Sequence, residues 1–115
     1  MVADRDASFE IFKVFKECLS ESCVEKAGLD EAFLDLTQAV QDELASADDD
    51  EKRQLVRDAN DNDKWLCLAP LTLDDADVRL AAGARVADRI RATLYERLRY
   101  TCAAGVAHNL MLAKF

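Results

Sequence analysis

Residues 72–115 read TLDDADVRLAAGARVADRIRATLYERLRYTCAAGVAHNLMLAKF, and this stretch decides the predicted fold. Thr72 and Asp75 have the spacing of a capping box and follow Pro70, which predicts a helix start at this point. Beyond it, small and apolar side chains recur every three or four residues, the spacing of one helix face. They are Leu80, Gly83, Ala87, Ile90, Leu94, Leu98 and Thr101. After Cys102 the residues are apolar nearly all round, as in a helix that is buried on several sides.

One unbroken helix over this stretch is too long for a chain of this size. At 1.5 Å per residue it would span roughly 60 Å. A compact domain of this length has a diameter of only about 35 Å. We therefore expect the segment to break into two helices near Gly105, with the second helix threading the core. The alternative is a protruding helix that another chain covers.

The same periodicity divides the preceding residues into helices. Residues 8–27 have the pattern of an amphipathic helix. A second helix is expected from a cap at Asp30 to Ser46, and a short third helix over residues 49–59 after a capping box at Asp48 and Glu51. Residues 60–64 predict a turn, and the apolar run 65–71 predicts a buried connector.

The fold class predicted from these patterns is all-α. We expect a compact bundle of four or five helices that forms a single domain over residues 1–115. Its expected core consists of Phe12, Phe15, Phe33, Leu36, Val40, Leu55, Trp65, Ile90, Leu94 and Leu98.

Charge and cysteine content indicate which partners and which cellular compartment to expect. The 115 residues carry a net charge of -8, and only 3 of the 23 acidic residues lie from Ala76 onward, against 7 of the 15 basic ones. A net negative charge repels nucleic acid and anionic membranes, so neither is predicted as a partner. The first residues contain no apolar leader, which favours a cytoplasmic protein with its 4 cysteines reduced.

Metal sites are not predicted. Cys18 and Cys23 are five positions apart, which on a helix places them on different faces, and no C-x2-C pair occurs. Asp58, Asn60 and Asn62 match the first three ligand positions of a calcium loop. The match fails beyond them, at the positions that require glycine and glutamate. No cofactor is predicted either.

Few residues suggest catalysis. His108 is the only histidine, and the sequence contains no glycine-rich phosphate loop, GxSxG or HExxH pattern. A small enzyme with a site hidden in its core therefore ranks third among the predicted functions. Second is a bundle that binds a metal or a small apolar ligand. The residues that would form a reactive or ligand-binding site are Trp65, Cys67, Cys102 and His108.

The leading prediction is a non-enzymatic protein-interaction module. Arg79, Arg91 and Arg97 flank the apolar stripe and are expected to pair with acids of the first three helices. Other arginines point outward and could orient a protein partner or a second copy in a homodimer that forms through the C-terminal helix. The predicted interaction surface consists of Arg85, Arg89, Leu94, Leu98, Arg99 and Leu110.

Overall fold

The computed structural model describes residues 2–28, 30–61, 70–107 and 110–115, with side chains from Phe9 onward. Within these ranges four antiparallel strands form one sheet in the order β1-β2-β4-β3, so the prediction of an all-α bundle is wrong. In chain order the elements are α1 (Val2–Cys18), a 3-10 helix η1 (Glu21–Cys23), β1 (Val24–Gly28), β2 (Glu31–Asp35), α2 (Thr37–Ala45), α3 (Asp49–Asp61), α4 (Asp75–Leu98), β3 (Ala103–Ala107) and β4 (Leu110–Lys114).

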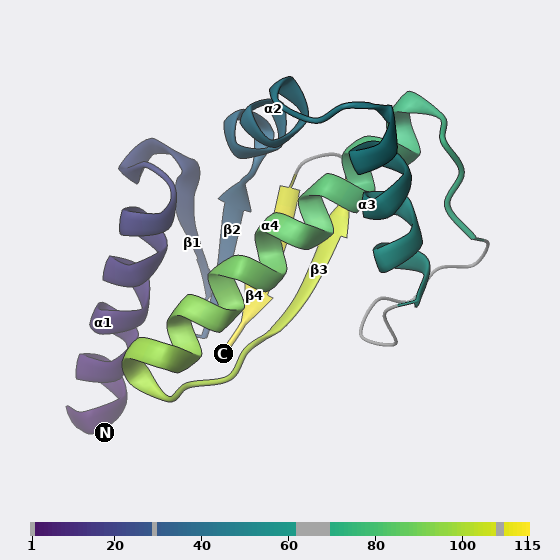
Figure 1. Ribbon diagram of the computed structural model, residues 1–115. Helices are drawn as coiled ribbons and strands as arrows, with labels where there is room; N and C mark the ends of the chain where they lie inside the picture. Colours follow the sequence, from purple (N-terminus) through teal and green to yellow (C-terminus); the bar gives the residue numbers. More distant parts are fainter. Residues whose placement is uncertain (1, 29, 62–69, 108–109) are drawn as a thin grey trace.

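The sheet has one packed face and one open face. Figure 1 shows α4 crossing the sheet, with α1 beside it and α3 against its first half. Along β2 and β4, buried and unburied residues alternate, as expected for strands that are covered on one side. The buried residues are Ala32, Leu34, Met111 and Ala113. Their neighbours along the strands point to the opposite face, which none of the described helices covers.

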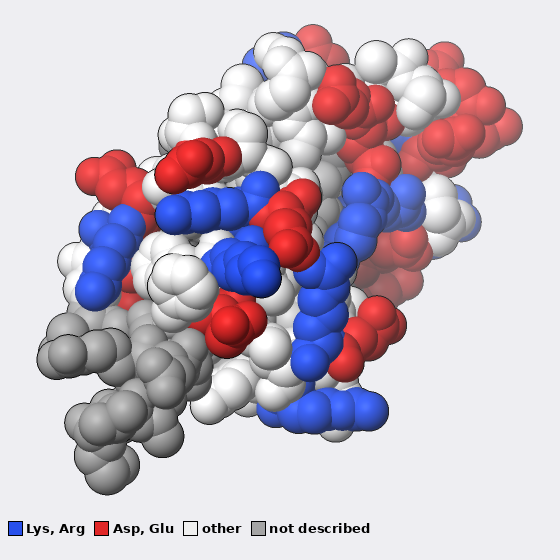
Figure 2. Space-filling model, turned by 90° about the vertical axis from the view of Figure 1, so that its left-hand side faces the viewer, with Lys and Arg blue, Asp and Glu red and all other residues white. Residues whose placement is uncertain are grey.

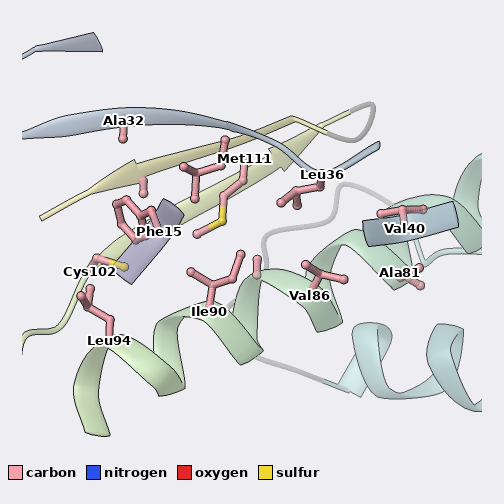
Figure 3. Close-up of a cluster of buried hydrophobic side chains, with 14 of the residues drawn as sticks. Phe15, Ala32, Leu36, Val40, Ala81, Val86, Ile90, Leu94, Cys102 and Met111 are labelled. Carbon is pink, nitrogen blue, oxygen red and sulfur yellow. The ribbon is translucent and has the colours of Figure 1, made fainter. Parts of the chain in front are cut away.

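The core lies between α4 and the packed face of the sheet. In Figure 3, Val86, Ile90 and Leu94 extend from α4 toward the strands that carry Ala32 and Met111. The ring of Phe15 enters the same layer from α1. Burying such side chains stabilises the fold by about 1.5–3 kcal/mol each, so this layer is the main stabilising contact of the molecule.

The N-terminal third differs from the prediction because two of its segments are extended. The helix predicted over residues 8–27 ends at Cys18. Of the helix expected from Asp30 to Ser46, the first part is β2 and only the last part is helical, as α2. Asp35 explains where α2 begins. Its carboxylate accepts hydrogen bonds from the Thr37 backbone N–H at 2.9 Å and from the Thr37 hydroxyl at 2.6 Å, which satisfies the first exposed donor of the helix.

The C-terminal stretch breaks earlier than predicted, and the second part is not a helix. Helix α4 ends at Leu98, and Arg99 follows in the left-handed conformation with φ of 59°. Its backbone N–H donates to the Tyr95 carbonyl at 2.8 Å, a common way to end a helix. Gly105, the predicted break point, lies inside β3. Strands β3 and β4 are separated by residues 108–109, the two-residue spacing of a hairpin.

Helix α3 confirms the predicted third helix. The Glu51 backbone N–H donates to the Asp48 carboxylate at 2.8 Å, as expected for the capping box. The start predicted at Thr72 is wrong, because α4 begins at Asp75. Thr72 instead donates from its N–H and its hydroxyl to the Asp77 carboxylate, at 2.8 and 2.9 Å.

Most of the predicted core is confirmed. Phe15, Leu36, Val40, Leu55, Ile90 and Leu94 are buried, and Phe12 and Leu98 are partly buried against them. The prediction that Phe33 belongs to the core is wrong, because its side chain is 37% exposed on the open face of the sheet. Trp65, most of the predicted turn and most of the predicted connector lie outside the described residues.

Candidate active site

A pair of carboxylates marks the turn of the β1–β2 hairpin. Asp30 lies in this turn, and Glu31 is the first residue of β2. The backbone carbonyl of Asp30 accepts a hydrogen bond from the Phe115 N–H at 2.9 Å, which joins the turn to the end of β4. The Phe115 ring in turn packs edge-on against Phe12 and Phe15 of α1, with ring centroids 5.7 and 6.0 Å apart. The backbone of this turn is therefore tied to the packed core.

Lys114 lies directly opposite Glu31 in the register of β2 and β4. Opposed residues on antiparallel strands have Cβ atoms about 5 Å apart, so the two side chains start from neighbouring positions on this face. The ion pairs found among the described residues do not include these two groups. Gly28 stands across from Glu31 on the other side, in β1. A Cβ there would lie 3.6 Å from Oε1 of Glu31, an ordinary van der Waals contact, so the Glu31 carboxylate lies close to the backbone of β1.

The middle of the open face, next to these charged residues, is apolar. Phe33 pairs with Leu112, and Leu112 pairs with Gly105 of β3, so the three residues form one row across the strands. Asp35 pairs with Leu110 in a further row. The large apolar side chains of this face are unusually accessible: Phe33 and Leu112 are each 37% exposed and Leu110 is 44% exposed. The acidic and basic cluster is thus continuous with an exposed apolar surface.

Asp35 shares this face but already has a structural role. The hydrogen bonds from the Thr37 hydroxyl and backbone N–H lower the pKa of its carboxyl below the ordinary value. Asp30 and Glu31 accept none of the side-chain hydrogen bonds found among the described residues. Glu25 of β1 is exposed on the same face as Phe33 and likewise accepts none of them. Asp30 and Glu31 differ from it in being adjacent residues at the hairpin turn, beside the end of β4.

Asp30 and Glu31 can be tested as ligands of a divalent cation. Among the described residues no group of three or more His, Cys, Asp or Glu side chains forms a ready-made metal site. Magnesium, however, is commonly held by only one or two carboxylates, with substrate phosphates and water completing its octahedron. Two adjacent carboxylates beside a lysine therefore suit a magnesium ion that arrives with a phosphorylated substrate.

The structure does not bring the predicted interaction surface together. Leu94 is buried, Leu98 is half-buried, and Leu110 lies on the open face of the sheet. Arg85 pairs with Asp58 of α3 at 3.1 Å, and Arg89 pairs with Glu43 of α2. Arg99 ends α4 and places its guanidinium 5.2 Å from the centre of the Tyr95 ring.

Several arginines of α4 form ion pairs with acidic residues of other helices. Besides the two pairs already named, Arg97 of α4 pairs with Glu17 of α1, as the sequence predicted for this arginine. Helix α4 thereby forms an ion pair with each of the three helices that precede it. Figure 2 shows one side of the molecule, where basic and acidic side chains are intermingled over the centre and acidic side chains gather at the upper right.

Of the predicted reactive or ligand-binding site, only Cys102 is described. Trp65, Cys67 and His108 lie outside the described residues. Burial raises the pKa of the Cys102 thiol, and the nearby Arg91 partly opposes this effect. Arg91 donates from Nε to the Cys102 carbonyl at 2.8 Å. A thiol with a raised pKa is a poor nucleophile near neutral pH, so the surroundings of Cys102 favour a structural role.

A comparison with known protein families shows to which family the chain belongs. The model of the family described as impB/mucB/samB matches residues 1–115, the whole chain. The chain belongs to the impB/mucB/samB family. Curated relatives of this family member include DNA polymerase eta of Arabidopsis thaliana and DNA polymerase iota of Homo sapiens. The first is 31% identical over 130 residues, covering 96% of this chain and 18% of that protein. The second is 32% identical over 111 residues, covering 96% and 14%.

A third relative is also a DNA polymerase. DNA polymerase iota of Drosophila melanogaster is 40% identical over 93 residues, which cover 79% of the chain and 12% of that protein. The chain thus spans less than a fifth of the length of these relatives. No solved structure matches it.

These relatives overturn the functional predictions made from sequence. The proteins that this impB/mucB/samB chain resembles are DNA polymerases, which are enzymes that act on DNA. The leading prediction of a non-enzymatic interaction module is therefore wrong. The expectation that no nucleic acid is a partner is also wrong. A negative net charge describes the whole surface and does not exclude a local site for DNA. None of the described helices is long and apolar enough to cross a bilayer.

Sequence reasoning missed Asp30, Glu31 and Lys114 as candidate site residues. The sequence around Asp30 fits a helix cap, so Glu31 falls within the helix predicted from Asp30 to Ser46. A usable signal was present in Ala32, Leu34 and Leu36, which are apolar at every second position, the period of a strand. Phe33 obscured this signal, because it adds an apolar residue at one of the positions that should be polar.

Proposed function

We propose that this chain forms part of the catalytic domain of a DNA polymerase, with nucleotide addition taking place at the open face of its sheet. The observation that carries the proposal is the cluster at the hairpin turn, where Asp30 and Glu31 lie beside Lys114 of β4. The polymerase relatives support it, because they align with 79–96% of this chain.

Nucleotide addition is a phosphoryl transfer. The 3′-hydroxyl oxygen of the growing strand forms a bond to the α-phosphorus of a nucleoside triphosphate. The bond from that phosphorus to the pyrophosphate oxygen breaks, and the hydroxyl proton leaves to a base or to water. Catalysis of this kind consists mainly of positioning the reactants and stabilising charge on the phosphate oxygens.

Lys114 suits the triphosphate end of this reaction. Its ammonium group is a compact positive charge that can contact several phosphate oxygens. Its position opposite Glu31 places that charge next to the carboxylates. Lys114 would therefore bind and orient the triphosphate, and neutralise charge that develops on the departing pyrophosphate.

Asp30 and Glu31 would hold the divalent cation that accompanies the triphosphate. When bound, such an ion neutralises phosphate charge and lowers the pKa of the attacking hydroxyl. The connection of Asp30 to Phe115 fixes the hairpin turn, so the two carboxylates keep their place relative to β4.

The proposal is tested by primer extension with the full-length protein. Glu31→Gln and Asp30→Asn keep the shape of each side chain but remove its charge. We expect each change to lower the rate of nucleotide addition by roughly 100-fold or more while the protein still binds primer–template DNA. Glu96→Gln is the matched control, because Glu96 is an exposed carboxylate of α4, on the other side of the sheet from this cluster. Rates close to wild type in both site variants would rule out this active site.

Two earlier predictions remain open under this proposal. A single domain over residues 1–115 stays a prediction, and so does the cytoplasmic location. A role in DNA synthesis would place the protein wherever its DNA template is found.

A further inference from the structure

Phe33 is the feature of the open face that the proposed chemistry leaves unexplained. It lies two residues beyond Glu31 on β2, on the same face, at a distance of about 6.8 Å along the strand. Its neighbours Ala32 and Leu34 are completely buried on the other face, whereas its own ring is 37% exposed.

The exposed ring belongs to a flat apolar row. Leu112 stands opposite Phe33 and is equally exposed, and Gly105 continues the row on β3. A Cβ at Gly105 would meet nothing within 4 Å, so the row is open to solvent at this end. Contiguous exposed apolar surface next to polar residues is typical of a binding site.

We propose that Phe33 and Leu112 form an apolar seat for the terminal nucleotide of the DNA strand that is being extended. This inference rests on the proposed function, because it assigns a substrate position to the surface next to Asp30 and Glu31. The seat is continuous with that cluster through β2 and β4. Aromatic side chains stack on bases of any sequence, as a polymerase that copies every template sequence requires.

The charges around Phe33 determine which part of the nucleotide it contacts. Its partner across β1 is Glu25, and Asp35 follows two residues along β2 on the same face. Both are acidic, so a phosphate group over this row would be repelled. The neutral base and sugar suit the row, whereas the phosphates of the incoming nucleotide suit Lys114 in the adjacent row.

The seat is tested by measuring how tightly the full-length protein binds two primer–template duplexes. One primer ends in a normal nucleotide, and the other ends in an abasic residue. We expect wild-type protein to bind the normal end about tenfold more tightly. Phe33→Ala and Leu112→Ala should each reduce this preference, with Phe33→Ala bringing it close to onefold. Phe9→Ala is the matched control, because Phe9 is a 70% exposed phenylalanine of α1.

Two controls separate the possible failures. If Phe33→Ala lowers the yield of folded protein, Phe33→Leu keeps an apolar side chain without a ring and should still lose most of the preference. A Phe33→Ala protein that folds normally and distinguishes the two primers as well as wild type would overturn the seat. The proposed active site would survive that result as long as Glu31→Gln still abolishes nucleotide addition. Activity in Glu31→Gln would instead reject the active site itself.

Discussion

Glu31 and Lys114 lie opposite each other on adjacent antiparallel strands, although they come from distant parts of the chain. Both side chains are on the face of the sheet that the described helices leave open. The ion pairs of the described residues do not include these two groups. A triphosphate with its cation can therefore bind here without first breaking a salt bridge between them.

Replacing Lys114 should affect the nucleotide more than the DNA. We expect Lys114→Ala to raise KM for the incoming nucleoside triphosphate about tenfold or more, because a charged hydrogen bond to phosphate is lost. Affinity for primer–template DNA should change much less. Steady-state kinetics at varied nucleotide concentration measure the first quantity, and fluorescence anisotropy measures the second. Lys26→Ala removes an exposed lysine of β1 and should leave KM unchanged. An unchanged KM in Lys114→Ala would contradict the assignment.

Replacing Gly83 with alanine should destabilise the protein, even though Gly83 lies inside a helix. Alanine normally stabilises a helix by about 1 kcal/mol relative to glycine. Here an added Cβ would lie 3.0 Å from Cγ1 of Val106, a residue of β3 whose branched side chain has little freedom to move. We expect Gly83→Ala to lower the free energy of unfolding by about 1 kcal/mol. Urea denaturation measures this change.

A second substitution identifies the cause. Val106→Ala removes the methyl group that the new Cβ would meet, so the double variant should lose less stability than the sum of the two single variants. Gly105→Ala has open space around its Cβ and should not be destabilised. Strict additivity of the Gly83 and Val106 changes would mean that the close contact is not responsible.

Asp35 should stabilise the protein only while it is ionised. Replacing it with alanine removes the acceptor for the first amide of α2, which should cost about 1 kcal/mol at neutral pH. The hydrogen bonds from Thr37 lower the pKa of Asp35 from its ordinary value of 3.8. The folded state therefore binds this proton less tightly than the unfolded state. The stabilisation by the Asp35 carboxylate is therefore complete above its ordinary pKa of 3.8 and is lost as the pH falls through the lowered pKa of the folded state.

Thermal or urea unfolding at a series of pH values checks this prediction. The difference in stability between wild type and Asp35→Ala should be constant near neutral pH and should shrink below about pH 4. Glu25→Gln, measured in parallel, corrects for general acid effects. A difference that stays constant down to pH 2 would show that the Asp35 charge does not contribute.

Two arginines of α4 should differ in their importance for stability. Arg85 forms an exposed ion pair with Asp58, and such pairs contribute only about 0–1 kcal/mol. Arg91 is less exposed and donates to the backbone carbonyl of Cys102, which lies just before β3. Truncating Arg91 leaves that carbonyl without its partner, at a cost of about 1–3 kcal/mol. We expect Arg91→Ala to lower Tm clearly more than Arg85→Ala. The reverse order would contradict this account of the two contacts.

The predictions from sequence succeeded where the deciding contacts are local. Helix α3 follows from Asp48 and Glu51, whose hydrogen bond spans three residues. The buried stripe of α4, with Ile90 and Leu94, follows from a spacing of three to four residues. Arg97 pairs with an acid of one of the first three helices, as its position beside that stripe predicts, whereas Arg91 pairs with Asp88 of its own helix. Caps and periodicity need no knowledge of the remaining chain.

Only the tertiary structure decided the sheet and, with it, the candidate site. Short apolar runs such as residues 103–107 and 110–113 fit a buried helix or a strand equally well. Their extended state is stabilised by hydrogen bonds to strands that are remote in sequence, since β4 pairs with β2. The sequence alone determined the helix faces and much of the core. The pairing of distant strands determined that Asp30, Glu31 and Lys114 meet, because sheet hydrogen bonds depend on contacts that no local pattern contains.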